Sequence, residues 1–240
     1  MRRRQKLGFW YRLVIMVVKP LLLLLTKRDW RGAEHLPADG GIIVAANHVS
    51  EIDPLVIGHF LYEHGRAPRF LAKSELFRKP PLKWILEGAR QIPVRRNTAD
   101  ASAALAPAVE ALRSGECVLI YPEGSATRDP QMWPMKARTG IARLALLSGA
   151  PVVPIAQWGA QQILPYKSRR PTLFPRRTMR VLVGPPVDLS GYVGRPLSAE
   201  VLRDATDVVM RTVAAQLADI RGESAPEQFF DMAAQKKESA

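Results

Sequence analysis

The sequence predicts an α/β fold: a single domain with a mostly parallel central sheet flanked by helices, preceded by an N-terminal helical segment. Short apolar runs of strand length alternate along the chain with longer stretches of helical spacing, as in parallel sheets built from strand–helix units. Polar side chains follow several of these runs directly, at the edge where open α/β sheets bind ligands. A chain of 240 residues with 47% apolar residues is long enough for one such domain and an appendage.

The composition restricts the partners of the protein more than its fold. A formal net charge of +13 favours an anionic partner: a membrane surface, nucleic acid, or a phosphorylated or acidic-protein substrate. The single cysteine, Cys117, excludes an internal disulfide and suits a reducing cytoplasm, and we interpret it as buried packing. No group of cysteines and histidines has the spacing of metal ligands, so we predict no metal site. The four histidines stand apart, at His35, His48, His59 and His64.

Residues 1–31 combine basic, aromatic and aliphatic side chains. Arg12, Lys19 and Pro20 interrupt the apolar run, whereas a membrane-spanning helix needs about 20 mostly apolar residues. Aromatic residues beside cations are typical of helices that lie in the membrane interface. We therefore predict a kinked helix or short helical hairpin lying in one leaflet, a peripheral or monotopic attachment to the cytoplasmic face of the cell membrane. The alternatives are a signal peptide, a single tilted span, or a first helix packed on the domain.

The stretch from Gly40 to Gly58 organises the rest of the chain. Ile42 to Ala46 is a continuous apolar run and predicts a short buried strand. Asn47 and His48 follow where this strand ends, and Pro54 suits the first turn of the helix that comes next. A polar turn thus joins a buried strand to a helix at the ligand-binding edge of the sheet.

The spacing between His48 and Asp53 allows two interpretations. On one regular helix these side chains would point about 140° apart, so a pair requires His48 to lie on the turn and bend back. The aspartate would then fix the histidine tautomer and leave the other ring nitrogen as a general base. Alternatively, Asp53 (or Ser50) only caps the helix and His48 is a turn residue, which is the interpretation that the spacing alone favours.

The remainder of the chain continues the alternation of strands and helices. Strands are predicted around 70–72, 92–94, 116–121, 150–159 and 179–189, and helices at 77–88, 100–113, 137–147 and 199–217. The last residues are polar and expected to be loosely ordered. The predicted organisation is an N-terminal segment at 1–31, a folded domain at 32–222 and a C-terminal tail at 223–240.

The sequence NHVSEIDP at residues 47–54 resembles the N-H-x4-D block of the glycerolipid acyltransferases, the PlsC-like family. These enzymes move an acyl chain from a thioester carrier onto glycerol phosphate or lysophosphatidic acid. The resemblance implies a membrane enzyme of phospholipid biosynthesis that needs no cofactor, with acyl-coenzyme A or acyl-carrier protein as co-substrate. Three further stretches resemble other blocks of the family in the family's order: GARQIPVRR at 88–96, PEGSATRD at 122–129 and APVVPIAQWG at 150–159.

The resemblance implies catalytic roles at the strand–helix turn. His48 would be the general base and Asp53 the residue that orients it, with Asn47 among the substrate-binding residues. Lys73 lies in a Lys-x-Glu-Leu stretch similar to the family's and would meet an acidic headgroup or a carrier phosphate; the alternative is an ordinary solvated lysine.

The second and third blocks imply a binding site for the acceptor. Arg95 would bind the acceptor's phosphate, because guanidinium matches phosphate bidentately, and Arg96 is its rival for this role. Glu123 would hydrogen-bond a glycerol hydroxyl or orient Arg95.

The third block departs from the family's usual Pro-Glu-Gly-Thr-Arg-Ser pattern. Gly124 keeps the backbone open to close approach by a ligand, and Ser125 stands for the family's threonine. Ala126 stands where the family often has arginine. Arg128, two residues later, is then the substitute, or Arg95 carries the phosphate alone.

The expected reaction is acylation of lysophosphatidic acid to phosphatidic acid. Glycerol 3-phosphate, another lysophospholipid or an amino-lipid are alternative acceptors, and a catalytically inactive peripheral-membrane or nucleic-acid-binding protein is a further alternative. No RNA-binding aromatic motif or helix-turn-helix pattern is present, so we expect no nucleic-acid partner. A basic cluster at 167–177 would face anionic lipid, an acidic carrier protein or the phosphates of coenzyme A.

Overall fold

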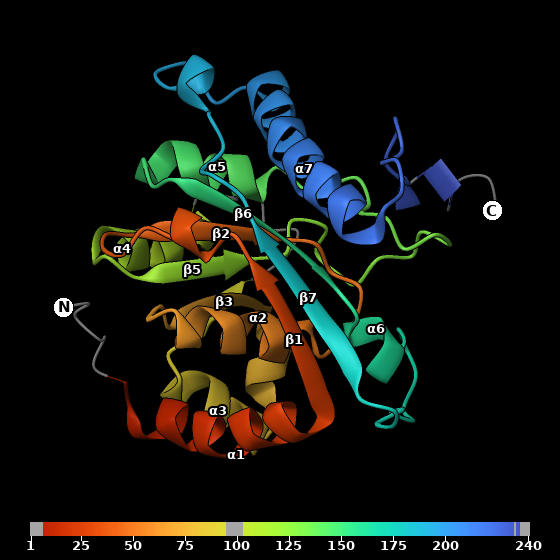
Figure 1. The fold of residues 1–240 in the computed structure, drawn as a ribbon. Coiled ribbons are helices and arrows are strands. Elements are labelled where there is room, and N and C mark those ends of the chain that lie inside the picture. The colour runs from red at the N-terminus through yellow and green to blue at the C-terminus, as the bar shows by residue number, and fades with distance from the viewer. Residues whose placement is uncertain (1–6, 95–102, 233, 236–240) are drawn as a thin grey trace.

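The computed structural model describes residues 7–94, 103–232 and 234–235. Within these residues, seven strands form one sheet in the order β1-β7-β6-β2-β5-β3-β4, in which the β6–β7 pair is antiparallel and the other pairs are parallel (Figure 1). The predicted single α/β domain with a mostly parallel sheet is therefore confirmed. The strands are β1 Thr26–Arg31, β2 Ile42–Ala46, β3 Pro68–Lys73, β4 Ile92–Val94, β5 Cys117–Ile120, β6 Val152–Trp158 and β7 Arg177–Val183.

Helices cover both faces of the sheet. They are α1 Phe9–Leu25, α2 Asp53–Glu63, α3 Leu82–Gly88, α4 Ala106–Arg113, α5 Gly140–Ser148, α6 Ala160–Ile163 and α7 Ala199–Arg221. Figure 1 shows α5 and α7 above the sheet and α1, α2 and α3 below it. The side chains of β2 alternate between the two layers. Ile42, Val44 and Ala46 share a core cluster with α2, whereas Ile43 and Ala45 pack with α4, α5 and α7.

The central strands bring three loops to one edge of the sheet. β2 lies between β5 and β6 and runs parallel to both. The segments that follow these three strands therefore meet at the same edge, as in other open α/β sheets. These segments begin at Asn47, Tyr121 and Gly159.

The N-terminal segment forms one helix, α1, rather than a helical hairpin, and Pro20 lies inside it. The helix contacts α2 and α3, and Lys19 forms an ion pair of 2.7 Å with Glu63 of α2. In this respect it resembles the predicted alternative of a first helix packed on the domain. Across residues 7–94, 103–232 and 234–235, no helix has the length and apolar character needed to cross a membrane.

Residues 26–31, which the sequence pattern assigns to the N-terminal segment, form the edge strand β1. The strand pairs with β7 in a parallel register from Thr26 opposite Arg177 to Arg31 opposite Leu182. Its sequence, TKRDWR, lacks alternating apolar residues because most of its side chains are partly or fully exposed. The pattern that identifies the buried strands is therefore absent from this one.

The C-terminal tail packs against the domain in its described part. Phe230 forms a β-bridge with Met135, and its carbonyl oxygen accepts a hydrogen bond of 3.0 Å from the main chain of Lys136. The side chain of Lys136 reaches Asp231 at 3.1 Å. Phe230 and Asp231 thus support the loop that precedes α5, whereas the polar composition of the tail predicts loose order.

We predict that Gly41→Ala, immediately before β2, destabilises the fold. A Cβ at Gly41 would lie 2.0 Å from the carbonyl oxygen of Leu112, at the end of α4. The free energy of unfolding, measured by urea denaturation, should fall by about 1–3 kcal/mol. The main chain of Leu112 cannot move away from the added Cβ without disturbing the packing around it. The control is Gly140→Ala, where an added Cβ would meet no described atom within 4 Å apart from its chain neighbours and its own helix backbone, and alanine favours helix. Equal stabilities of the two variants would contradict this account.

Candidate active site

The turn between β2 and α2 holds a histidine–aspartate pair. His48 Nδ1 lies 2.8 Å from Oδ2 of Asp53, which is the first residue of α2 and is fully buried. The same oxygen accepts hydrogen bonds from the main chain of Val49 at 2.6 Å and of Ser50 at 2.8 Å. His48 thus bends back and pairs with Asp53, as the first of the two interpretations predicts. A purely capping role for Asp53 would not include this contact.

Burial sets the electrostatics of the pair. It raises the pKa of Asp53, because the carboxylate loses its hydration, while the bonds from His48, Ser50 and Val49 lower it. Its second oxygen, Oδ1, has no hydrogen-bond partner among the described residues. A proton on Nδ1 of His48, donated to Asp53, leaves the lone pair of Nε2 available to a substrate. The imidazole stacks on the ring of Tyr121, with centroids 4.3 Å apart.

The loop after β5 forms hydrogen bonds with the main chain of His48. The N–H group of His48 donates to Oε1 of Glu123 at 3.0 Å, and its carbonyl oxygen accepts from the N–H of Thr127 at 2.7 Å. Oε2 of Glu123 accepts from the N–H of Met135 at 2.9 Å. Burial raises the pKa of Glu123 to about 8, against the lowering effect of its two main-chain hydrogen bonds.

Asn47 is buried and joins β2 to β6. Its side-chain oxygen accepts from the N–H of Gln157 at 2.8 Å, and its amide nitrogen donates to the carbonyl of Gln157 at 3.1 Å. The side chain of Gln157 returns a hydrogen bond to the carbonyl of Asn47 at 3.3 Å. The geometry gives Asn47 a structural role, and its predicted contact with substrate stays a prediction. Nothing in the sequence marks Gln157, 110 residues away, as its partner.

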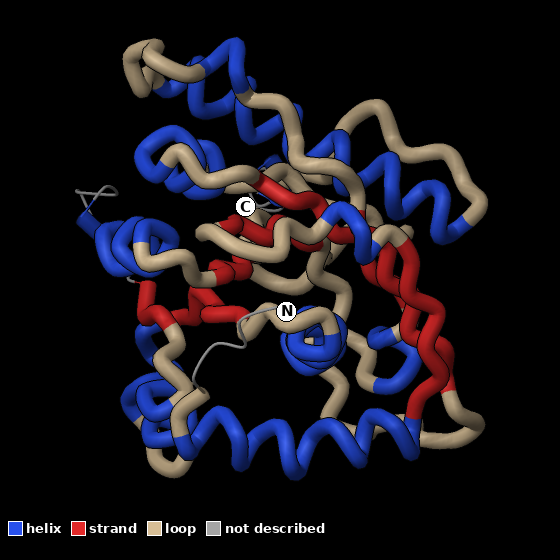
Figure 2. Tube along the Cα trace, turned by 60° about the vertical axis from the view of Figure 1, so that its left-hand side comes forward, coloured by secondary structure: helices blue, strands red, loops and turns tan. Residues whose placement is uncertain are grey.

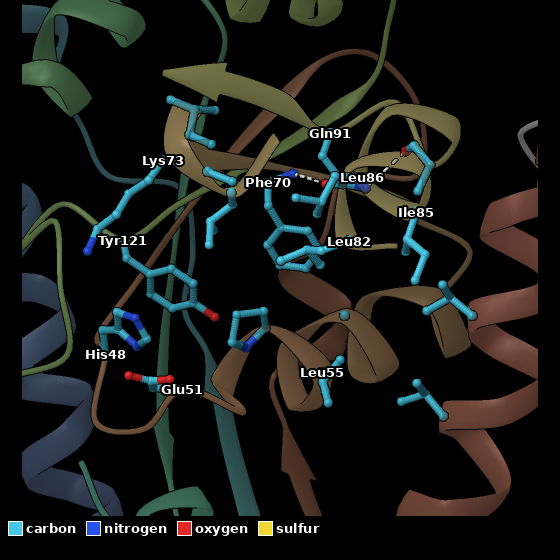
Figure 3. Close-up of a pocket in the computed structure, with 18 of the residues that line it drawn as sticks. His48, Glu51, Leu55, Phe70, Lys73, Leu82, Ile85, Leu86, Gln91 and Tyr121 are labelled. Atoms are coloured by element: carbon cyan, nitrogen blue, oxygen red, sulfur yellow. Dashed lines mark hydrogen bonds between the residues drawn. The ribbon is translucent and has the colours of Figure 1, made fainter. Parts of the chain in front are cut away.

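A pocket of about 580 Å³ extends from His48 between α1, α2, α3 and β3. Figure 3 shows His48 and Glu51 at one end and Ile85 and Leu86 at the other, with Phe70 between them. Most of the lining is apolar, and α1 contributes one wall. The lining residues of α1 are Tyr11, Val14, Ile15, Val18 and Lys19.

Four other predicted site residues line the same pocket as His48: Lys73, Gly124, Ser125 and Arg128. Lys73 and Arg128 are exposed cations, and Gly124 has a φ of 80°, a left-handed conformation that favours glycine. Glu51, an exposed carboxylate that the sequence analysis does not single out, also lines the pocket beside His48. Arg95 and its rival Arg96 lie outside the described residues, so their predicted phosphate contact stays a prediction.

Comparisons with known proteins identify similar sequences and a similar fold. A protein-family model described as Acyltransferase matches residues 27–158, which include His48, Asp53 and Glu123. The 1-acyl-sn-glycerol-3-phosphate acyltransferase of Bacillus subtilis (strain 168) is 30% identical over 183 residues, 75% of this chain and 83% of that protein. A lyso-ornithine lipid O-acyltransferase of Pseudomonas aeruginosa is 32% identical over 112 residues, 46% of this chain and 40% of that protein.

A solved structure extends the likeness over most of the fold. It is the crystal structure of the 1-acyl-sn-glycerophosphate (LPA) acyltransferase, PlsC, from Thermotoga maritima. The TM-score is 0.65 and the sequence identity 25%, and the match covers 90% of this chain and 81% of that one. The likeness therefore extends well beyond residues 27–158.

The raised pKa of Glu123 predicts a pH dependence of stability. Between an ordinary pKa of 4.5 and the folded value of about 8, the folded protein keeps a proton that the unfolded chain loses. The contribution of this carboxyl to stability therefore falls as pH rises through that range. Urea denaturation at several pH values should show wild type losing more stability than Glu123→Gln, which cannot titrate. Parallel pH profiles would show that Glu123 does not bind the proton.

Proposed function

The chain belongs to the acyltransferase family, and from this premise we propose that it transfers a fatty acyl chain from an acyl thioester to lysophosphatidic acid. The product is phosphatidic acid, an intermediate of phospholipid synthesis. The observation that carries the proposal is the His48–Asp53 pair at one end of a largely apolar pocket. The names of the Bacillus subtilis and Thermotoga maritima relatives support this choice of acceptor.

The reaction requires two proton transfers: one from the acceptor hydroxyl to His48 and one from His48 to the leaving thiolate. Nε2 of His48 takes the proton from the acceptor hydroxyl, whose oxygen attacks the thioester carbonyl. The tetrahedral intermediate collapses, the carbon–sulfur bond breaks, and the imidazolium returns the proton to the leaving thiolate. Asp53 keeps Nδ1 protonated and the ring oriented throughout. A thioester is already activated, so this mechanism uses no metal, cofactor or acyl-enzyme intermediate.

The pocket separates the two ends of the substrates. The acyl chain lies between α1, α2 and α3, where the lining is apolar. The charged headgroup of the acceptor stays at the end near His48, where Lys73 and Arg128 provide exposed cations. Arg95 joins them in this proposal on the strength of its sequence block. Gly124 and Ser125 face the pocket beside the acceptor's glycerol unit.

We also propose that the protein docks on an anionic membrane at the cytoplasmic face through α1. Figures 1 and 2 show α1 along the lower edge of the molecule. Arg176, in the basic 167–177 cluster, donates hydrogen bonds to the carbonyls of Leu23 and Thr26 at the end of α1. The basic cluster thus adjoins an apolar helix surface, a combination that favours anionic lipid. The exposed apolar residues of α1 are Phe9, Met16, Val17, Leu21, Leu23 and Leu24.

A second candidate acceptor is a lysolipid whose headgroup carries an amine. Glu51 places a carboxylate beside His48, and Ala126 replaces an arginine that is frequent in the family. Both features reduce the positive charge that a phosphate monoester prefers. The lyso-ornithine lipid acyltransferase of Pseudomonas aeruginosa is a relative named for such an acceptor.

The proposed reaction is tested by thiol release from palmitoyl-coenzyme A in detergent. Lysophosphatidic acid, glycerol 3-phosphate and a lyso-ornithine lipid are offered separately to wild type and to His48→Ala. We expect release that depends on lysophosphatidic acid and falls about 10²–10⁴-fold in His48→Ala, the usual contribution of a general base. Release with another acceptor would reassign the substrate, and full activity of His48→Ala would refute the mechanism.

The membrane proposal predicts that charge on the outer surface of α1 weakens binding to vesicles. Met16 and Leu24 are 67% and 66% exposed, so Met16→Glu and Leu24→Glu should fold normally. Each should reduce sedimentation with vesicles that contain anionic phospholipid, because a carboxylate opposes both burial and the surface potential. The control is Val193→Glu, since Val193 is 71% exposed on a loop far along the chain from α1. Equal loss in all three variants would contradict docking through α1.

A further inference from the structure

The main chain of His48 is fixed more firmly than its pairing with Asp53 requires. Within the described part of the chain, three hydrogen bonds hold the residue: Nδ1 to Asp53, N–H to Glu123 and the carbonyl to Thr127. The last two come from the loop after β5, about 75 residues further along the chain. This loop therefore holds the main chain that carries the imidazole, in addition to lining the pocket.

Glu123 is placed to hold His48 and away from substrate. One carboxyl oxygen accepts from His48 at 3.0 Å and the other from Met135 at 2.9 Å. The side chain is buried, at 6% exposure. Among the described residues that line the pocket, the next three residues after Glu123 are present and Glu123 itself is not. Its two oxygens are thus engaged inside the protein.

The far end of this connection is anchored as well. Met135 forms a β-bridge with Phe230, and the neighbouring N–H of Lys136 donates to the Phe230 carbonyl. Thr127, which binds the His48 carbonyl, donates its hydroxyl to the carbonyl of Trp133 at 2.6 Å. Glu123 therefore connects His48 to a loop that is itself held by hydrogen bonds and by the β-bridge to Phe230.

We propose that Glu123 is a positioning residue, which holds the main chain of His48 in its reactive place and does not contact the acceptor. The proposal rests on the acyl-transfer function proposed above. It differs from both roles that the family resemblance implies for Glu123, a hydrogen bond to a glycerol hydroxyl or the orientation of Arg95. A misplaced base slows the chemical step, because reactivity falls steeply with small errors in distance. Acceptor affinity is set elsewhere in the pocket and is left intact.

The test is Glu123→Gln, a substitution that keeps the size of the side chain. A carboxyl oxygen, ionised or protonated, can accept an N–H hydrogen bond, whereas an amide nitrogen cannot. In either orientation, therefore, glutamine leaves the N–H of His48 or of Met135 without its acceptor. Steady-state kinetics with lysophosphatidic acid should show kcat falling about 10- to 100-fold with little change in KM.

The matched control is Glu116→Gln. Glu116 precedes the same strand, β5, at the opposite end, and pairs with Arg69 at 2.9 Å and Arg90 at 3.0 Å. This variant also loses a carboxylate with two partners, but none of them belongs to the candidate active site. We expect its kcat to match wild type at a temperature where both variants are folded, as checked by circular dichroism.

A second readout does not depend on activity. Diethyl pyrocarbonate modifies accessible, unpaired imidazoles, and mass spectrometry gives the rate at His48. Loosening of the His48 main chain should weaken its bond to Asp53 and accelerate modification in Glu123→Gln, but not in Glu116→Gln. If wild type transfers no acyl group to any acceptor, the proposed function fails, and these rates still decide the role of Glu123.

Two results would overturn the proposal. A large rise in KM for the acceptor with kcat retained would show that Glu123 contacts the substrate. Unchanged kcat together with an unchanged modification rate at His48 would show that its hydrogen bond to His48 has no positional effect. A fall in kcat with faster modification of His48, absent from the control, supports it.

Discussion

One buried carboxylate governs the geometry of the site. Asp53 lies at the start of α2 with 0% of its surface exposed, so hydrogen-bond donors of the protein must replace water around it. Its Oδ2 receives Nδ1 of His48 and the N–H groups of Val49 and Ser50, all from the turn that precedes it. These bonds bend the turn back over the helix start, and in the proposed mechanism Nε2 of His48 acts on the substrate. The proposed general base and its partner thus lie within six consecutive residues.

The parallel sheet supplies long-range contacts that hold the turn in place, which six consecutive residues cannot provide by themselves. Because β2 lies between β5 and β6, the loops after these strands reach the turn from both sides. The β6 side fastens Asn47 through Gln157, and the β5 side fastens His48 through Glu123 and Thr127. The main chain on both sides of the imidazole is thus held by tertiary contacts, although the pairing of His48 with Asp53 is local.

This division explains what could be predicted from the sequence. The strand, turn and helix around His48 are signalled by neighbouring residues, but spacing alone favours a capping Asp53, and only the resemblance to a family points to a pair. The contacts of Asn47 with Gln157 and of His48 with Glu123 join residues 110 and 75 positions apart, which no periodicity marks. The edge strand β1 is missed because its exposed sequence lacks the apolar alternation of a buried strand.

The pocket connects this site to the surface of α1, since the helix lines the pocket with one face and exposes apolar side chains on another. A structure with bound lysophosphatidic acid and a non-reactive thioether analogue of palmitoyl-coenzyme A tests the account most directly. The proposed mechanism predicts that the acceptor hydroxyl lies within about 3 Å of Nε2 of His48. The acyl chain should lie between α1, α2 and α3. An acyl chain outside this pocket, or a hydroxyl beyond the reach of His48, would contradict it.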